Sequence, residues 1–219
     1  ETDCEGPCET CELKHPKEIV TFWTKSLRIR EDSYDMAVYI QNPNEVISSS
    51  ELNYEFVLFD DLGVIAYRAG KTFIYPRERL HLAEANIQTT RLPTRAEFKI
   101  TKVSWRTENI ELPILTVDEK SYKILRQDSL PAQAGTQGAI EATISNRSSF
   151  GLREVELTFV ALDKDENLLG VNRSLIENLE SRSSRSLRST WPEKLKDAPA
   201  KIIVEPRINL FKTSAILQP

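Results

Sequence analysis

From Ile19 onward, the chain is a succession of short apolar runs interrupted by turn residues. Alternate positions are apolar in the segment 34–40, and the same alternation recurs over 155–161. Other runs of this texture are IVTFW, LNYEFVLFDDLG, AEFKITKVSW, AIEATISNRSS and AKIIVEPRINLF. A period of two with β-branched and aromatic enrichment is typical of half-buried strands. The pattern therefore predicts an all-β fold.

Helical periodicity is scarce. The segment SLIENLES, residues 174–181, could form two helical turns. The segment RERLHLAEANI, residues 77–87, can be interpreted as a helix, but the alternation of Leu80 and Leu82 suits a strand equally well. The two segments are the only ones in which we expect any helix.

An internal repeat of about 104 residues organises the sequence. IQNPN at 40–44 matches ISNRS at 144–148, and FVLFDDLGVIAYR at 56–68 matches FVALDKDENLLGVNR at 159–173. PTRAEFKITKVSW at 93–105 matches PAKIIVEPRINLF at 199–211. Three matches in the same order and at nearly constant spacing indicate a duplication. Each copy has the size of one β-sandwich.

The sequence thus predicts two tandem immunoglobulin-like antiparallel β-sandwiches. We divide the chain into a Cys-rich segment 1–17, a first sandwich 18–118 and a second sandwich 119–219. Two strand-like stretches lie near this boundary, LPILTV at 112–117 and SYKILR at 121–126. We interpret them as the last strand of the first sandwich and the first strand of the second.

Composition narrows the function classes. A net charge of −4 gives no general attraction to nucleic acid or to an anionic membrane, so neither is an expected partner. No run of 18 apolar residues occurs that could span a bilayer. The chain begins at Glu1 without Met, so we expect a trimmed fragment that is held to the membrane through an anchor upstream of Glu1.

The three cysteines, Cys4, Cys8 and Cys11, all lie in the first eleven residues. Their spacing also occurs in iron–sulfur radical enzymes, but the βα alternation of such enzymes is missing. With His15 the cysteines could form a Cys3His zinc set. Alternatively, two of them form a disulfide and the third is left without its partner.

The segment ETDCEGPCETC resembles the end of a cysteine motif of bacterial surface proteins, C-x-D-G-I-x-N-x-x-E-T-D-x-D-C-G-G-x-C-x-x-C. The matching residues are Glu1, Thr2, Asp3, Cys4, Gly6, Pro7, Cys8 and Cys11. The chain departs from the motif by lacking one acidic-turn insertion and by carrying Glu5 in place of Gly. The resemblance implies a further cysteine upstream and an oxidising, extracytoplasmic setting.

The repeat itself is similar to FxLYD-type domains of bacterial envelope proteins. The residues that carry the resemblance are Asn42, Pro43, Asn44, Phe56, Leu58, Phe59, Asp60 and Gly63, and in the second copy Asn146, Phe159, Leu162, Asp163 and Asn167. Arg147 and Ser148 replace the Pro-Asn pair there. The whole layout looks like surface-anchored proteins of uncultured small-genome bacteria. The resemblance implies a fold and a location, and no common catalytic site.

The repeat residues suit turns for physical reasons. Asn42 accepts turn geometry, and Pro43 cannot continue a strand ladder. Asp60 to Gly63 predicts a hairpin in which Gly supplies a positive φ. DKDEN at 163–167 mimics the opening of a calcium loop, but no Gly follows and no Glu closes the loop. We therefore predict a tight turn here and in the matching turn of the first copy.

No catalytic pattern emerges. The two histidines, His15 and His81, lie far apart, and no nucleophile elbow, P-loop or zinc-protease motif occurs. We expect no enzyme activity and no cofactor. The arginines of SRSSRSLRST, residues 181–190, are more consistent with a solvated face than with a polymer-binding one.

The sequence analysis therefore favours a non-catalytic cell-surface or envelope module, acting as a spacer, adhesion or assembly protein. Its partner is a protein or a cell-surface polymer of unknown identity. One alternative is a carbohydrate-binding module with exposed stacking aromatics, whose candidates are Trp23, Trp105, Trp191, Tyr67 and Tyr75. The other is a metal-binding protein that uses the N-terminal cysteines.

Overall fold

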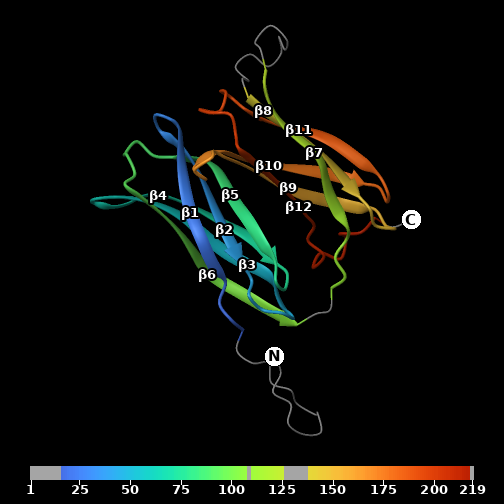
Figure 1. Cartoon of the computed structure of the whole chain (residues 1–219). Coiled ribbons are helices and arrows are strands. Elements are labelled where there is room, and N and C mark those ends of the chain that lie inside the picture. Colours follow the sequence, from blue (N-terminus) through green and yellow to red (C-terminus); the bar gives the residue numbers. More distant parts are fainter. Residues whose placement is uncertain (1–15, 108–109, 126–137, 218–219) are drawn as a thin grey trace.

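A computed structural model describes residues 16–107, 110–125 and 138–217 (Figure 1). The described chain consists of strands and loops and contains no helix. The strands are β1 Val20–Arg30, β2 Ser33–Gln41, β3 Ile47–Asp60, β4 Gly63–Ile74, β5 Arg79–Gln88, β6 Arg95–Thr107, β7 Leu115–Ile124, β8 Gly138–Asn146, β9 Leu152–Leu162, β10 Leu168–Leu179, β11 Ser184–Trp191 and β12 Lys201–Arg207.

The strands form four three-stranded antiparallel sheets. The first sandwich combines the sheets β1-β2-β5 and β4-β3-β6, and the second combines β11-β8-β7 and β10-β9-β12. The two sandwiches have the same strand order. Each strand of the first corresponds to the strand of the second whose number is six higher, so that β1 corresponds to β7. The all-β fold of two tandem immunoglobulin-like sandwiches is therefore confirmed, and the matching topology supports the duplication.

Each sandwich has its own core. The core of the first is made mainly of residues that alternate along β2, β3 and β5, with one residue at the end of β4: Tyr34, Met36, Val38, Ile40, Leu52, Tyr54, Phe56, Leu58, Ile74, Leu80, Leu82 and Ile87. The core of the second includes Ile140, Ile144, Val155, Leu157, Phe159, Ile176, Trp191 and Val204. Because side chains alternate between the faces of a strand, the other face of each sheet is free for other contacts.

A buried asparagine ties three segments together in the first sandwich. Asn42 is fully buried after β2, and its Nδ2 donates to the carbonyl oxygens of Ile47 and Tyr75 at 2.7 and 2.9 Å. Its Oδ1 accepts from the backbone N–H of Asn44 at 3.0 Å. Asn44 in turn exchanges two hydrogen bonds with the backbone of Lys17, which precedes β1. The segment from Asn42 to Asn44 therefore holds three loops together and also ends the strand β2.

The second sandwich repeats this arrangement with different residues. Asn146 donates from Nδ2 to the carbonyl oxygens of Phe150 and Glu180 at 2.8 and 3.1 Å, and accepts from the N–H of Ser148. The Ser148 hydroxyl accepts from the N–H of Ile114, just before β7. Asn146 and Ser148 thus take the places of Asn42 and Asn44. A buried amide that satisfies several loop backbone groups explains why Asn stands at this point in both copies.

The structure corrects two expectations about the elements. Residues 115–124 form one strand, β7, which pairs along its length with β8 and bulges at Glu119, whose φ is 49°. The assignment of LPILTV to the first sandwich is therefore wrong, because its strand residues belong to β7 of the second sandwich. The expected boundary near Asp118 falls inside the second sandwich. The possible helix at 174–181 is also wrong, because β10 runs to Leu179 and pairs with β9.

Candidate functional site at the junction of the two sandwiches

The two sandwiches dock through the outward faces of β1-β2-β5 and β10-β9-β12. Ala37 and Ala83 of the first sandwich pack against Val160, Leu162, Leu168 and Val171 of the second. Trp23, Leu27 and Ile203 border this apolar patch. The two alanines have short side chains, so the sheets can approach closely. The two inner sheets, β1-β2-β5 and β10-β9-β12, therefore meet through an apolar contact.

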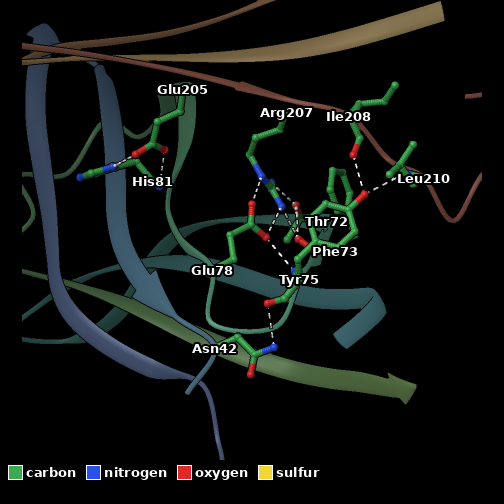
Figure 2. A network of polar contacts seen from close by, with 10 residues as sticks. All are labelled: Asn42, Thr72, Phe73, Tyr75, Glu78, His81, Glu205, Arg207, Ile208 and Leu210. Carbon is green, nitrogen blue, oxygen red and sulfur yellow. Dashed lines mark hydrogen bonds and ion pairs between the residues drawn. The ribbon is translucent and has the colours of Figure 1, made fainter. Parts of the chain in front are cut away.

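A histidine and a glutamate join the sandwiches beside the apolar patch (Figure 2). The Glu205 carboxylate on β12 accepts from the backbone N–H of His81 on β5 at 2.7 Å. Its other oxygen lies 2.7 Å from Nδ1 of the same residue, which donates to it. The imidazole is buried and stacks on Tyr39, with ring centroids 4.3 Å apart. These contacts fix the relative position of β5 and β12.

Arg207 makes the most extensive polar contact of the junction (Figure 2). Its guanidinium donates to both carboxylate oxygens of Glu78, at 2.8 and 3.2 Å, and to the carbonyl oxygen of Phe73 at 2.7 Å. It also donates to the Thr72 hydroxyl and lies 4.1 Å from the Phe73 ring centroid. The side chain is only 9% exposed. A buried pair of this kind specifies one geometry more than it adds stability.

Tyr75 anchors the tail that follows β12. Its hydroxyl donates to the carbonyl oxygen of Ile208 at 2.7 Å and accepts from the N–H of Leu210 at 2.9 Å. The ring is buried against Phe211, with centroids 5.5 Å apart. Burial, with the nearby Glu78 carboxylate, raises the pKa of Tyr75 to about 12, so the hydroxyl stays protonated and can donate. The Asn42 amide holds the carbonyl of this same residue (Figure 2).

A groove of 610 Å³ opens along one side of the junction, with walls from both sandwiches. The Tyr54 hydroxyl donates to Glu84 at 2.9 Å, and Arg173 pairs with the same carboxylate at 3.2 Å across the boundary. Burial and the Glu84 carboxylate raise the pKa of Tyr54. Glu156 on the central strand β9 also lines the groove. The groove therefore carries charged groups of both signs from both sandwiches.

The turn residues expected from the repeat lie in turns. The Asp60 carboxylate accepts from the N–H of Leu62 at 2.9 Å and pairs with Arg91, and Gly63 has a φ of 128°. In the second copy, Asp163 accepts from the backbone N–H of Asp165 and of Asn167, both at 2.8 Å. The Asn167 side chain also donates to Asp163 and lowers its pKa. The Asp163 oxygens are therefore engaged within the turn itself.

The proposed metal and disulfide residues Cys4, Cys8, Cys11 and His15 lie outside the described residues, so both interpretations of them stay predictions. Within residues 16–107, 110–125 and 138–217, no group of three or more His, Cys, Asp or Glu residues is arranged to hold a metal ion. The same part of the chain has no helix long and apolar enough to cross a membrane.

The candidate stacking aromatics do not share an exposed face. Trp191 and Tyr75 are buried, the former donating from Nε1 to the carbonyl oxygen of Val171. Trp23 and Trp105 are half-buried, and Trp23 packs at the junction. Among these five residues, therefore, only Tyr67, at 66% exposed, is open to solvent, and the carbohydrate-binding alternative stays a prediction.

The arginines of 181–190 contact the chain's own acceptors. Arg188 donates to Glu141 at 2.9 and 2.6 Å, and Arg185 donates to the carbonyl oxygen of Glu177 at 2.9 Å. Lys123 also pairs with Glu141 and, with Arg188, lowers its pKa. Lys123, Glu141 and Arg188 lie on the outer face of β7-β8-β11, where exposed ion pairs contribute little stability, whereas Arg185 reaches across to β10 of the other sheet.

No protein-family model matches this chain, and no curated protein matches it. The geometry of the junction must therefore support any functional conclusion by itself.

Sequence reasoning missed the junction residues Glu78, Glu205 and Arg207, and it considered Tyr75 only as a stacking aromatic. One signal was present: in IIVEPR, Glu205 and Arg207 occupy alternate positions on the same face as the apolar Ile203. Charged residues that share a strand face with an apolar residue indicate that this face packs against a partly polar surface. The sequence alone does not tell which surface covers it.

Proposed function

We propose that the chain is a non-catalytic surface or envelope module, a spacer, adhesion or assembly protein, in which the two sandwiches act as one rigid block. The observation that supports this most is the docked junction. An apolar contact between Ala83 and Val160 is flanked by the His81–Glu205 and Arg207–Glu78 contacts. Such an interface holds two domains in one orientation, whereas domains joined only by a linker move relative to each other.

The rigid block suits a mechanical or assembly role. A surface module must present its binding faces at a fixed distance and angle, and the polar contacts of the junction select one such geometry. The surfaces that remain open are the outer faces of β4-β3-β6 and β11-β8-β7 and the loops at the sandwich ends. Loops on a rigid scaffold are common binding elements. The partner is a protein or a cell-surface polymer.

The location can be tested on intact cells that produce the full-length protein. A membrane-impermeant amine-reactive biotin reagent should label the protein before lysis, because the described chain exposes many lysines, such as Lys71 and Lys164. A cytoplasmic protein in the same cells serves as the control and must stay unlabelled. Labelling of this chain only after lysis would remove the surface role.

A further inference from the structure

The strand β6 has one side without a partner. It lies at the edge of the sheet β4-β3-β6 and pairs along its length with β3. On its other side, the backbone of residues 95–105 makes no hydrogen bond to any described part of the chain. In a constant-type immunoglobulin sandwich, the strand at this position has a second neighbour. Here the chain passes from β6 to β7 of the second sandwich, and the described residues after β6 do not supply that neighbour.

An apolar groove runs along the same edge. It has a volume of 470 Å³ and lies between β6 and the beginning of β1. Its apolar lining consists of Ile19, Phe98, Ile100, Val103 and Trp105. The Phe98 ring also packs on two aromatic rings of the core, with centroid distances of 5.6 Å to Tyr54 and 5.3 Å to Phe56. An apolar side chain inserted into the groove would therefore extend the core of the first sandwich.

The corresponding edge of the second sandwich is less suited to pairing. β12 takes the place of β6 but has seven residues, whereas β6 has 13. β12 also contains Pro206, which has no backbone N–H and is typical of edges that do not accept a further strand. β6 contains no proline. Of these two corresponding edges, only that of β6 combines a long backbone ladder with the absence of proline.

The charged side chains of β6 favour an acidic strand beside it. The strand carries four cations and one carboxylate: Arg95, Lys99, Lys102, Arg106 and Glu97. The charges of the groove lining itself balance, with Glu18 and Lys102. Neighbouring strands lie about 5 Å apart, so an added strand would be next to the β6 side chains and about 10 Å from the carboxylates of β3. Opposite charges across strands attract and like charges repel, which also disfavours pairing of β6 with a second copy of itself.

We propose that the edge of β6 binds an extended segment of a partner protein as an added strand. Apolar side chains of the segment enter the groove, and its acidic side chains lie beside the cations of β6. In this binding mode, main-chain hydrogen bonds give affinity and alternate side chains give specificity. The inference rests on the adhesion or assembly role proposed above and names the kind of partner. The site needs only the first sandwich, because both the edge and the groove belong to it.

Titration of ¹⁵N-labelled protein with defined peptides, followed by NMR, tests the site. The probe is acetyl-Glu-Val-Glu-Val-Glu-Val-Glu-amide. One control peptide has Lys in place of every Glu, and the other has Pro in place of the central Val, which interrupts the ladder. The acidic peptide should bind and slow amide hydrogen exchange within residues 95–105, and both controls should bind at least tenfold more weakly. Equal binding of the three peptides, or no binding of the acidic one, would overturn the proposal.

A charge reversal on β6 tests the preference for an acidic strand. Lys99→Glu should weaken binding of the acidic peptide at least tenfold and strengthen binding of the Lys peptide, because the variant reverses a charge next to the added strand. The matched control is Lys71→Glu on β4, the opposite edge of the same sheet, and it should bind like the parent protein. An unchanged affinity in Lys99→Glu, or an equal loss in both variants, would contradict the proposed site.

Filling the groove gives a second, independent test. Thr21 is exposed on β1 and lines the groove opposite β6, so Thr21→Trp should weaken binding of the acidic peptide at least tenfold. Thr90→Trp, at an exposed position in the loop between β5 and β6, should bind like the parent protein. Full affinity in Thr21→Trp would overturn the proposal. Surface labelling of intact cells does not involve the peptides, so the strand site and the surface role can fail separately.

Discussion

Asp35 is the buried residue whose ionisation most directly affects stability. It lies on β2 with 6% of its surface exposed and accepts from the N–H of Asn86 at 2.9 Å. Burial raises its pKa to about 6, and the hydrogen bond from Asn86 only partly opposes this. The folded state therefore favours the protonated form. The stability gained from this proton is complete below the unfolded pKa of 3.8 and is lost as the pH rises through about 6.

Replacing Asp35 should thus change the pH dependence of unfolding. We compare the change in the free energy of unfolding that Asp35→Asn causes at pH 7.5 with the change that it causes at pH 4. The change should be more favourable at pH 7.5 by about 2 kcal/mol, because the amide cannot ionise. Urea unfolding at both pH values measures this. Asp32→Asn, an exposed neighbour in the β1–β2 turn, is the control and should show no such difference. A parent protein whose stability does not fall between pH 4 and 7.5 would contradict the assignment.

Gly70 on the edge strand β4 provides the space for the ring of Tyr54. A Cβ at Gly70 would overlap the phenol ring, which reaches over the strand to bond Glu84. We expect Gly70→Ala to lower the free energy of unfolding by about 1–3 kcal/mol, since the buried ring must shift. The cost should shrink in a Tyr54→Leu background, measured as a double-mutant cycle by denaturant unfolding. Simple additivity of the two changes would show that the ring is not the cause.

The residue pattern predicted the turns better than the roles of the residues in them. Asn and Pro at 42–43 indicate the end of a strand, and the structure has β2 ending at Gln41. That the Asn42 amide is buried and bonds the backbone of Ile47 and Tyr75 depends on segments that meet only after folding. A local propensity has no information on such distant partners.

At the scale of elements, β12 is the strand that the sequence described least well. Its run IIV predicts a strand, which the structure contains, but Glu205 and Arg207 on the same strand serve the junction. The sequence did not show to which sandwich β7 belongs, for a different reason. Its bulge at Glu119 interrupts the alternation, so one strand was interpreted as the ends of two domains.

Arg207 should be the polar side chain on which docking depends most. We expect Arg207→Met to lower the free energy of unfolding by about 3 kcal/mol or more, because Glu78 and the Phe73 carbonyl lose a buried partner. The matched control is Arg188→Met, which removes a similar contact to Glu141 on an exposed outer face and should cost less than about 1 kcal/mol. Chemical denaturation compares them. Equal losses of unfolding free energy in the two variants would mean that the Arg207 contact contributes no more than an exposed ion pair.

At the scale of the whole molecule, the junction joins faces that are not equivalent in the duplicated sandwiches. β1-β2-β5 of the first copy packs on β10-β9-β12 of the second, which corresponds to β4-β3-β6 of the first. The two corresponding outer faces carry ion pairs instead, such as Lys102 with Glu51 and Arg188 with Glu141. The contact is thus head-to-tail, because different faces of the two copies meet.

Close approach at the centre of the junction depends on small side chains. We expect Ala83→Arg to separate the sandwiches, because it places a long charged side chain against Val160 and Leu162, at a cost of about 2 kcal/mol or more. Scanning calorimetry should change from one cooperative transition to two, with both sandwiches still folded. Ala69→Arg, on the exposed edge strand β4, should leave a single transition. A single transition in both variants would contradict an essential role for the alanine contact.

The orientation of the two sandwiches, measured by residual dipolar couplings of backbone amides in the parent protein, tests the rigid block most directly. One alignment tensor should fit the couplings of residues 16–107 and 138–217 together, with the relative orientation set by the Arg207–Glu78 and His81–Glu205 contacts. Two tensors of different magnitude would show that the sandwiches move independently. The docked junction would then not describe the protein in solution.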